Sequence, residues 1–199
     1  EAGSNSWVVH GSRTASGLPI LAGDPHRALD TPNVYYQSHV TCPEFDVTGL
    51  SFPGIPGFPH FGHNSQVAWC VTHTGADYQD LYLERFKDGD PPTYQFKDQW
   101  LTAEIHHETI DVRGQASVQL KVAVTHHGPV IAGGPETGSG LAFRYTATAE
   151  AQPWADILLE MLTVQTSHNM EEAMRSWVDP VNNFVFADVH GNIGYLNRG

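Results

Sequence analysis

Short runs rich in Val, Ile, Thr and aromatic residues recur along most of the chain, with Gly- and Pro-rich segments between them. Such runs are typical of β-strands bounded by turns. Gly114 and Gln115 separate two of the runs and predict a hairpin turn. We predict strands over residues 6–10, 19–22, 35–41, 46–50, 66–72, 81–86, 101–112, 117–125 and 140–148.

The pattern changes near the end of the chain, where apolar residues recur with helical spacing. Pro153 suits the first turn of a first helix, Asn169 and Glu172 form a plausible capping pair for a second, and Pro180 ends it. Each set of apolar residues forms a stripe along one face and predicts a helix that packs on the core. The first stripe consists of Trp154, Ile157, Leu158, Met161 and Leu162, and the second of Met170, Ala173, Met174, Trp177 and Val178.

A last hairpin follows over residues 183–195, with the sequence NFVFAD, a His-Gly-Asn turn and IGY. Strands followed by two helices and further strands predict the α+β class, with helices packed on a sheet.

Composition limits the function classes. The chain has 199 residues, enough for a sizeable core, and 40% of them are hydrophobic. The net charge of -12, with only 10 Lys and Arg, argues against nucleic-acid binding. No apolar run approaches the roughly 18–20 residues of a membrane helix, so we expect no membrane span. No signal-peptide pattern opens the segment.

Cysteines and histidines raise two further questions. Cys42 and Cys70 predict two buried free thiols, with a disulfide as the alternative in an exported protein. The pairs His106-His107 and His126-His127 fall on predicted strands. Neighbours on a strand point to opposite faces, so we expect neither pair to bind one ion alone. A histidine-based metallohydrolase therefore ranks below the function inferred next, and chelator-insensitive hydrolysis would dismiss it.

Motifs for other known chemistries are missing, but several segments match one family in order and spacing. These are residues 4–7 (SNSW), 19–27 (PILAGDPHR), 53–64 (PGIPGFPHFGHN), 68–73 (AWCVTH), 77–84, 127–130 (HGPV) and 183–195. The chain resembles the penicillin and cephalosporin acylases, most of all the cephalosporin and glutaryl branch. The resemblance runs from Ser4 to the last residue.

The resemblance implies an N-terminal-nucleophile hydrolase with an αββα sandwich. Residues 1–3 would be the tail of a spacer peptide, and residues 4–199 the N-terminal part of a catalytic β subunit that continues beyond this segment. The implied partners are an α subunit from the same precursor and the rest of the β subunit. The implied location is periplasmic or secreted.

The resemblance also implies catalytic roles for particular residues. The precursor would be cut between Gly3 and Ser4, and Ser4 would then supply both the nucleophilic hydroxyl and an α-amine as base. His26 would orient the nucleophile, with a loop histidine capping Asp24 as the alternative. Two groups would stabilise the oxyanion, namely the backbone N–H of His73 and the side chain of Asn183. Asn182 is the neighbouring alternative to Asn183.

Substrate and calcium positions follow in the same way. Tyr35, Tyr36, Phe58 and His60 match positions that set side-chain selectivity. His60 could hold an acidic acyl chain only when protonated, which argues against that specificity. A structural calcium ion is implied at Asp77, Gln79 and Asp80, and the alternative is a solvated acidic loop.

Together these inferences predict an amide-bond hydrolase acting through an acyl-enzyme. Its substrates would be β-lactam side-chain amides, N-acyl-homoserine lactones or related N-acyl compounds, and no organic cofactor is required. The alternative is an inert precursor or fragment that needs self-cleavage and the α subunit. Residues 1–3 favour that alternative for the uncut chain, because they leave Ser4 without a free amine.

Overall fold

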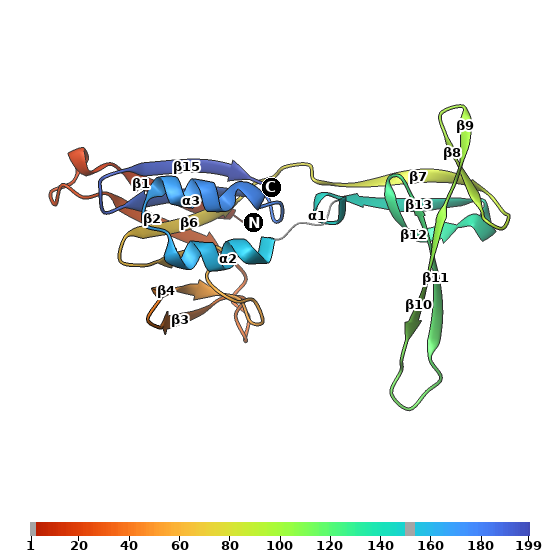
Figure 1. Cartoon of the computed structure of the whole chain (residues 1–199), viewed down its shortest axis with the longest axis horizontal. Helices are drawn as coiled ribbons and strands as arrows, with labels where there is room; N and C mark the ends of the chain where they lie inside the picture. The colour runs from red at the N-terminus through yellow and green to blue at the C-terminus, as the bar shows by residue number, and fades with distance from the viewer. Residues whose placement is uncertain (1–2, 150–153) are drawn as a thin grey trace. The chain divides into compact units, whose positions relative to one another are not determined.

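The computed structural model describes residues 3–149 and 154–199, which form two compact units (Figure 1). Unit 1 consists of residues 1–76 and 152–199, and unit 2 of residues 77–151. The predictions for Glu1, Ala2 and Pro153 lie outside the described residues. The α+β class is confirmed, because both units are rich in strands and unit 1 adds two helices.

Unit 1 contains a six-stranded antiparallel sheet in the order β15-β14-β6-β5-β4-β3 and a separate two-stranded hairpin, β1-β2. Its elements are β1 (Gly3–Val9), η1 (Gly11–Arg13), β2 (Ile20–His26), β3 (Tyr36–Thr41), β4 (Asp46–Ser51), β5 (Phe61–His63), β6 (Val67–His73), α2 (Trp154–Thr163), α3 (Ser167–Ala173), η3 (Met174–Ser176), β14 (Asn182–Asp188) and β15 (Ile193–Arg198).

One face of the six-stranded sheet is covered by α2 and α3, which carry the predicted apolar stripes. Trp69 on β6 and Phe184 on β14 point to this face, and Phe184 packs edge-on against Trp177 with ring centroids 5.1 Å apart. Met161 and Met170 are buried in the same cluster. The main core of unit 1 therefore lies between the helices and the sheet (Figure 1).

The opposite face of the sheet is covered by the β1-β2 hairpin. Gly23 on β2 lies so close to Cys70 on β6 that a Cβ at Gly23 would come within 2.6 Å of the Cys70 Cβ. The Cys70 thiol also donates to the carbonyl oxygen of Ala22 at 3.5 Å. Helices, sheet and hairpin thus form three successive layers, as expected for part of a sandwich with two central sheets.

Two polar side chains tie the loops of unit 1 to its helices. The side-chain oxygen of Asn64 accepts from the N–H of Val67, and its NH₂ group donates to the carbonyl oxygen of Val164 at 2.8 Å. Asp188, only 3% exposed, accepts from the N–H of Ser167 at 2.8 Å and from the N–H of Asn192. The geometry of the final hairpin turn therefore depends on a buried carboxylate.

Unit 2 is a sheet in the order β10-β11-β12-β13-β7-β8-β9, with all pairs antiparallel. Its small core includes Phe86, Tyr94 and Ala103. Its elements are β7 (Gln79–Lys87), β8 (Thr93–Phe96), β9 (Gln99–Thr102), β10 (Glu104–Ile110), β11 (Val118–Thr125), β12 (Gly128–Gly134), η2 (Pro135–Thr137), β13 (Ser139–Tyr145) and α1 (Thr146–Ala149).

Most predicted strands and both helices are confirmed, with some differences at their ends. The predicted strand 101–112 is two strands, because Ala103 leaves the ladder and donates its N–H to the carbonyl oxygen of Pro92. The predicted strand 140–148 ends at Tyr145 and continues as α1. The predicted capping pair was wrong: Thr166 is the N-cap of α3, and its hydroxyl accepts from the N–H of Asn169 at 3.1 Å.

Both cysteines are free thiols, so the disulfide alternative is not adopted; Cys70 is buried and Cys42 only partly so. Among the described helices, none has the length and apolarity required to span a membrane.

Candidate active site

Ser4 lies on the inner face of the β1-β2 hairpin, toward the six-stranded sheet. Side chains alternate along β1, so Asn5 and Trp7 are exposed while Ser4 is half-buried. Ser6 shares the inner face with Ser4 and lies close enough to Cys70 to oppose in part the burial that raises the pKa of that thiol to about 11. The alternation that shapes any β-strand thus directs Ser4 into the space between the two sheets.

The hairpin also places Ser4 at one particular end of the sheet. Leu21, near the start of β2, lines a cavity together with Ala187, and Pro25, near the end of β2, is the partner of Ser4. Ala187 lies near the far end of β14 and Asn183 near its start. The hairpin therefore carries Ser4 toward the end of the sheet where Asn183 lies.

The bond that precedes Ser4 is intact in this structure, since Gly3 belongs to β1. The Ser4 hydroxyl donates to the carbonyl oxygen of Gly3 at 2.6 Å. The nitrogen of Ser4 is an amide here and cannot serve as a base. The hydroxyl nevertheless lies beside the carbonyl group that it would have to attack for the chain to cut itself at this bond.

His26 pairs with Gly3 across the hairpin and not with Ser4. Its Nε2 is 3.0 Å from a carboxylate oxygen of Asp24 and 3.4 Å from the side-chain nitrogen of Asn5. These residues occupy the outer face of the hairpin, whereas Ser4 is on the inner face. The contact with Asp24 expected in the alternative is present, and orientation of the Ser4 hydroxyl by His26 requires a rearrangement of the uncut strand end.

Asn183 and Asn182, the two candidates for the oxyanion donor, point to opposite faces of β14. Asn183 shares the hairpin face with Thr72, and its NH₂ group donates to the Thr72 hydroxyl at 3.1 Å. Its carbonyl oxygen accepts from the Tyr195 hydroxyl at 2.7 Å and from the side chain of Asn197 at 3.0 Å. These contacts hold the amide with its NH₂ group toward the face on which Ser4 lies.

Three of these supporting residues were missed by the sequence reasoning: Thr72, Tyr195 and Asn197. The signal that identifies them is the period of two along neighbouring strands, once the register between β6, β14 and β15 is known.

His73 is the last residue of β6 and faces Asn182 across the ladder. The next pair is hydrogen-bonded, with the N–H of Thr74 donating to the carbonyl oxygen of Val181 at 3.1 Å. Hydrogen-bonded and non-hydrogen-bonded pairs alternate in antiparallel sheets. The N–H of His73 therefore points away from β14, at the same end of the sheet as Asn183.

Two of the predicted substrate residues, Tyr35 and His60, are brought together on the helix side of the sheet. The Tyr35 hydroxyl lies 2.9 Å from Nδ1 of His60, and Nε2 of His60 lies 3.2 Å from the side-chain nitrogen of Asn182. Because an amide nitrogen only donates, Nε2 accepts, and the ring proton resides on Nδ1. Burial, Arg27 and His73 lower the pKa of His60 to about 4.

With this pKa, His60 is neutral at physiological pH. Phe58 is only 2% exposed and belongs to the main core, whereas Tyr36 is 46% exposed on β3. The four substrate candidates therefore do not form one surface. Tyr35 and His60 lie at the same end of the sheet as Ser4 and Asn183, but across it.

The candidate calcium residues are at the start of unit 2. Asp77 and Asp80 are exposed and line one cavity together with Arg144. Asp80 pairs with Arg144 across the β7-β13 ladder and accepts a 3.4 Å hydrogen bond from Tyr82. A neighbouring guanidinium competes with a cation for these carboxylates, and Gln79 begins β7 beside them.

A second group of side chains, of the types that can bind metal ions, is found elsewhere in unit 2. Within the described residues, Glu84, His126 and His127 form the one group of at least three His, Cys, Asp or Glu side chains whose ligand atoms lie within 4.8 Å of one another. The two histidines lie in the turn between β11 and β12, and their ring centroids are 3.7 Å apart. The expectation that this pair lies on a strand with rings on opposite faces was wrong. His106 and His107 do lie on a strand, β10.

Comparisons with known proteins agree with the fold. The penicillin amidase family model matches residues 1–199. The penicillin acylase 2 proenzyme of Pseudomonas sp. (strain SE83) is 45% identical over 196 residues, which cover 98% of this chain and 25% of that protein. The acyl-homoserine lactone acylase QuiP of Pseudomonas fluorescens (strain Pf0-1) is 30% identical over 201 residues, covering 98% of this chain and 24% of that protein.

A solved structure is similar as well. The thermostable penicillin G acylase from Alcaligenes faecalis superposes with a TM-score of 0.78 at 26% identity, over 98% of this chain and 35% of that one. The expected N-terminal-nucleophile hydrolase fold is thereby confirmed. The chain spans about a quarter of the length of the curated relatives. Because the family model matches the whole segment, this chain belongs to the penicillin amidase family.

Proposed function

We propose that the full-length protein containing this segment hydrolyses the amide bond of N-acyl compounds with Ser4 as the nucleophile. The observation that carries the proposal is the position of Ser4, which faces the sheet from the hairpin at the end where the Asn183 amide is held. Penicillin acylases and acyl-homoserine lactone acylases are among its relatives, which supports β-lactam side-chain amides and N-acyl-homoserine lactones as substrate classes.

The proposed reaction has two steps. After the bond between Gly3 and Ser4 is cut, the new α-amine of Ser4 takes the proton from its own hydroxyl as the hydroxyl attacks the substrate carbonyl. The NH₂ group of Asn183 and the N–H of His73 donate to the oxyanion, and a single such donor is worth about 3–4 kcal/mol. The amine leaves with a proton, and water then releases the acid from Ser4.

Cutting of the chain is proposed to use the same hydroxyl. Attack by the Ser4 hydroxyl on the Gly3 carbonyl would transfer the acyl group from the Ser4 nitrogen to its oxygen, which breaks the C–N bond and frees the α-amine. Water would then hydrolyse the ester and release the Gly3 carboxylate and the Ser4 hydroxyl. The 2.6 Å contact between the hydroxyl and that carbonyl supports this step. Loss of residues 1–3 also uncovers the side of His26 that now lies against Gly3, which would allow His26 to approach the Ser4 amine.

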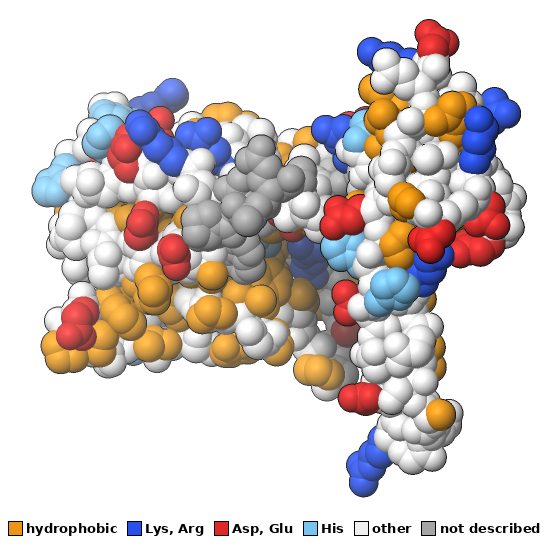
Figure 2. Space-filling model, turned by 45° about the vertical axis from the view of Figure 1, so that its right-hand side comes forward, with side chains coloured by type: hydrophobic (Ala, Val, Ile, Leu, Met, Phe, Trp, Pro, Cys, Tyr) orange, Lys and Arg blue, Asp and Glu red, His pale blue; other side chains and the backbone are white. Residues whose placement is uncertain are grey.

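Exposed apolar surface supports the proposed partners, an α subunit and the rest of the β subunit. Hydrophobic side chains gather low on unit 1 in Figure 2, at the level of β3 and α2 in Figure 1. Tyr36, Val40 and Leu159 are 46%, 46% and 65% exposed. Patches of this kind mark contact surfaces. Calcium at Asp77, Gln79 and Asp80 and an exported location remain part of the proposal.

Expression of the full-length protein with Ser4→Ala tests the proposal. We expect neither processing at Gly3–Ser4, read by mass spectrometry of the subunits, nor hydrolysis of N-acyl substrates. Ser6→Ala is the matched control, because Ser6 lies two residues along the same strand on the same face; it should be processed and active. Cleavage or hydrolysis that persists in Ser4→Ala would remove Ser4 from the mechanism.

The inert-precursor alternative has its own readout. It requires residues 1–3 to stay attached to Ser4 in the full-length protein, with no turnover of either substrate class. Chelator treatment distinguishes the metallohydrolase alternative from hydrolysis through Ser4. Hydrolysis through Ser4 needs no metal ion at the reacting carbonyl and should persist, whereas a metallohydrolase should lose its activity.

A further inference from the structure

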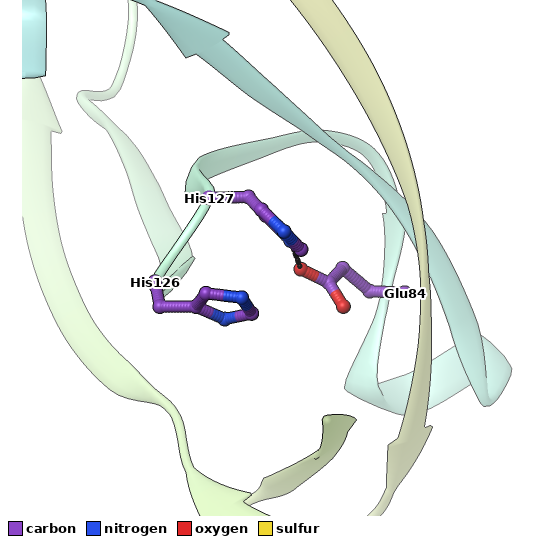
Figure 3. A group of neighbouring side chains, drawn as sticks. All are labelled: Glu84, His126 and His127. Carbon is purple, nitrogen blue, oxygen red and sulfur yellow. Dashed lines mark hydrogen bonds and ion pairs between the residues drawn. The ribbon is translucent and has the colours of Figure 1, made fainter. Parts of the chain in front are cut away.

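The turn between β11 and β12 brings two histidines against a buried glutamate of β7 (Figure 3). Nδ1 of His127 lies 2.8 Å from Oε1 of Glu84, and a ring nitrogen of His126 completes a group within 4.8 Å. Glu84 is 3% exposed, whereas His126 reaches solvent. We propose that Glu84, His126 and His127 bind a divalent transition-metal ion of the zinc class, with its remaining position open to solvent.

The donor set matches what such ions prefer. Two imidazole nitrogens and one carboxylate oxygen are common ligands of Zn²⁺, and a site with three protein ligands leaves a position for water. Hard cations such as Ca²⁺ and Mg²⁺ take oxygen ligands instead. The site therefore differs in chemistry from the candidate calcium residues Asp77 and Asp80.

The distances require only a small adjustment. Zinc–ligand bonds of about 2.0–2.2 Å at tetrahedral angles place ligand atoms about 3.4 Å apart. The His127–Glu84 pair is already closer than this, at 2.8 Å, so it opens slightly. Because the ligand atoms already lie within 4.8 Å of one another, His126 has to approach by no more than about 1.4 Å, and its side chain is exposed in a turn.

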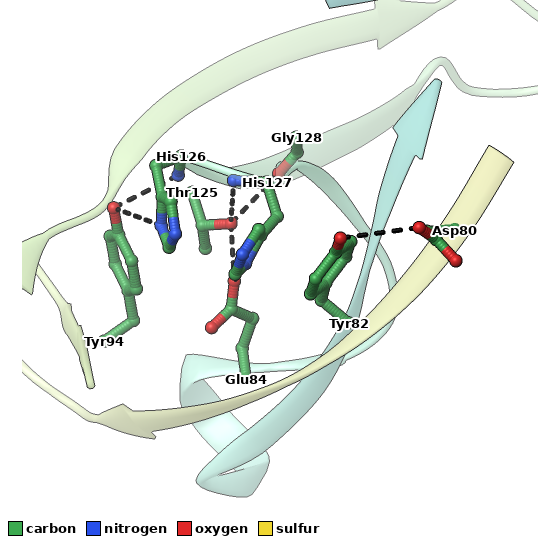
Figure 4. Close-up of polar contacts among 8 residues, drawn as sticks. All are labelled: Asp80, Tyr82, Glu84, Tyr94, Thr125, His126, His127 and Gly128. Carbon is green, nitrogen blue, oxygen red and sulfur yellow. Dashed lines mark hydrogen bonds and ion pairs between the residues drawn. The ribbon is translucent and has the colours of Figure 1, made fainter. Parts of the chain in front are cut away.

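Neighbouring groups are placed to hold the ligands in position (Figure 4). The Thr125 hydroxyl donates to Oε1 of Glu84 at 2.7 Å, and the Tyr94 hydroxyl lies 3.2 Å from Nδ1 of His126, which leaves Nε2 for the ion. Tyr82 stacks on His127 with ring centroids 3.7 Å apart and planes at 9°. Second contacts of this kind orient metal-binding histidines and carboxylates.

The charged groups of the site are the buried carboxylate of Glu84 and the nearby guanidinium of Arg144. A bound dication would in turn neutralise the buried carboxylate and replace the proton between His127 and Glu84. Arg144 is the opposing charge that limits affinity.

If the group binds no metal ion, the same contacts serve only as hydrogen bonds that join β7 to the β11-β12 turn. Titration with zinc chloride distinguishes a metal site from such a purely structural contact. The proposal predicts one zinc equivalent of micromolar or better affinity in the full-length protein, and an intense visible spectrum with Co²⁺ from near-tetrahedral geometry. His126→Ala should weaken that equivalent at least about 100-fold, since loss of a supporting contact alone costs up to about that much.

His106→Ala is the matched control, because His106 is an exposed histidine of the same unit that also pairs with a carboxylate, Glu104, at 2.9 Å. It should bind zinc as the unsubstituted protein does. Since His126 is exposed, His126→Ala should keep its fold, which circular dichroism checks. No zinc bound in the micromolar range, or equal binding by His126→Ala, would overturn the proposal. Hydrolysis through Ser4 is independent of either result.

Discussion

Protonation of His60 should destabilise unit 1 below neutral pH. The ring is 6% exposed, accepts from Asn182 on one nitrogen and contacts the Tyr35 hydroxyl with the other. Its pKa is about 4 in the folded chain and about 6.5 in the unfolded chain. The unfolded state therefore binds more protons between these values, so the stability is complete above about pH 6.5 and falls as the pH decreases toward 4.

The magnitude follows from the two pKa values. Linkage gives a loss of about 0.2 kcal/mol at pH 7 and about 2 kcal/mol at pH 5, rising to about 3 kcal/mol below pH 4. His60→Gln tests this, because an amide can donate and accept at the same place but does not titrate. Urea unfolding of the full-length protein measures the decrease in unfolding free energy from pH 7 to pH 5. This decrease should be about 2 kcal/mol smaller in His60→Gln than in the unsubstituted protein.

A matched control separates the effect of His60 on the pH dependence of stability from the effect of the other histidines. His63→Gln changes an exposed histidine of unit 1, on β5, and should keep the pH dependence of the unsubstituted protein. The reasoning is refuted if His60→Gln loses as much stability between pH 7 and pH 5 as the unsubstituted protein does.

Three further predictions concern other parts of the molecule. Asp188→Asn should lower the unfolding free energy by about 2–3 kcal/mol in denaturant titrations, because a charged acceptor of several N–H groups is lost. Hydrogen bonds from Ser167 and Asn192 outweigh the effect of burial and lower the pKa of Asp188. The contribution of Asp188 to stability is therefore complete above about pH 4 and is lost in acid. Asn183→Ala should reduce kcat of the processed enzyme about 100- to 1,000-fold. Asn182→Ala removes the contact with His60 and should mainly reduce stability. A large loss of kcat in Asn182→Ala, with only reduced stability in Asn183→Ala, would exchange their roles. If calcium binds at Asp77 and Asp80, its removal should lower the melting temperature, and Asp80→Asn should abolish that dependence; a calcium-independent melting temperature would contradict the site.

The pattern of hydrophobic positions was sufficient to predict that the helices of unit 1 pack on a sheet, whereas the sandwich was implied by the family resemblance. The helical spacing in α2 and α3 reflects one buried face, and the nearly continuous apolar runs in β6 and β14 reflect two. Both patterns are local properties of the sequence. Ends of elements were less predictable because they depend on distant partners. Ala103 leaves its strand to bond Pro92, and Thr166 caps α3 where Asn169 was expected.

The candidate site was likewise predictable where it depends on local sequence and unpredictable where it depends on distant partners. Motifs were enough to choose Ser4 and Asn183, but the face on which each lies depends on strand register. The position of His26 opposite Gly3 follows from pairing across the hairpin, which no local pattern encodes. The Glu84–His126–His127 group was missed because it requires β7 to pass beside a turn more than forty residues later.

Covalent labelling of the processed, full-length protein tests the central claim most directly. A sulfonyl fluoride reacts with an activated serine hydroxyl, and peptide mapping by mass spectrometry identifies the modified residue. The account predicts a single adduct at Ser4, formed as activity is lost and absent while residues 1–3 remain attached. An active protein whose inactivating adduct lies on any other residue would contradict it.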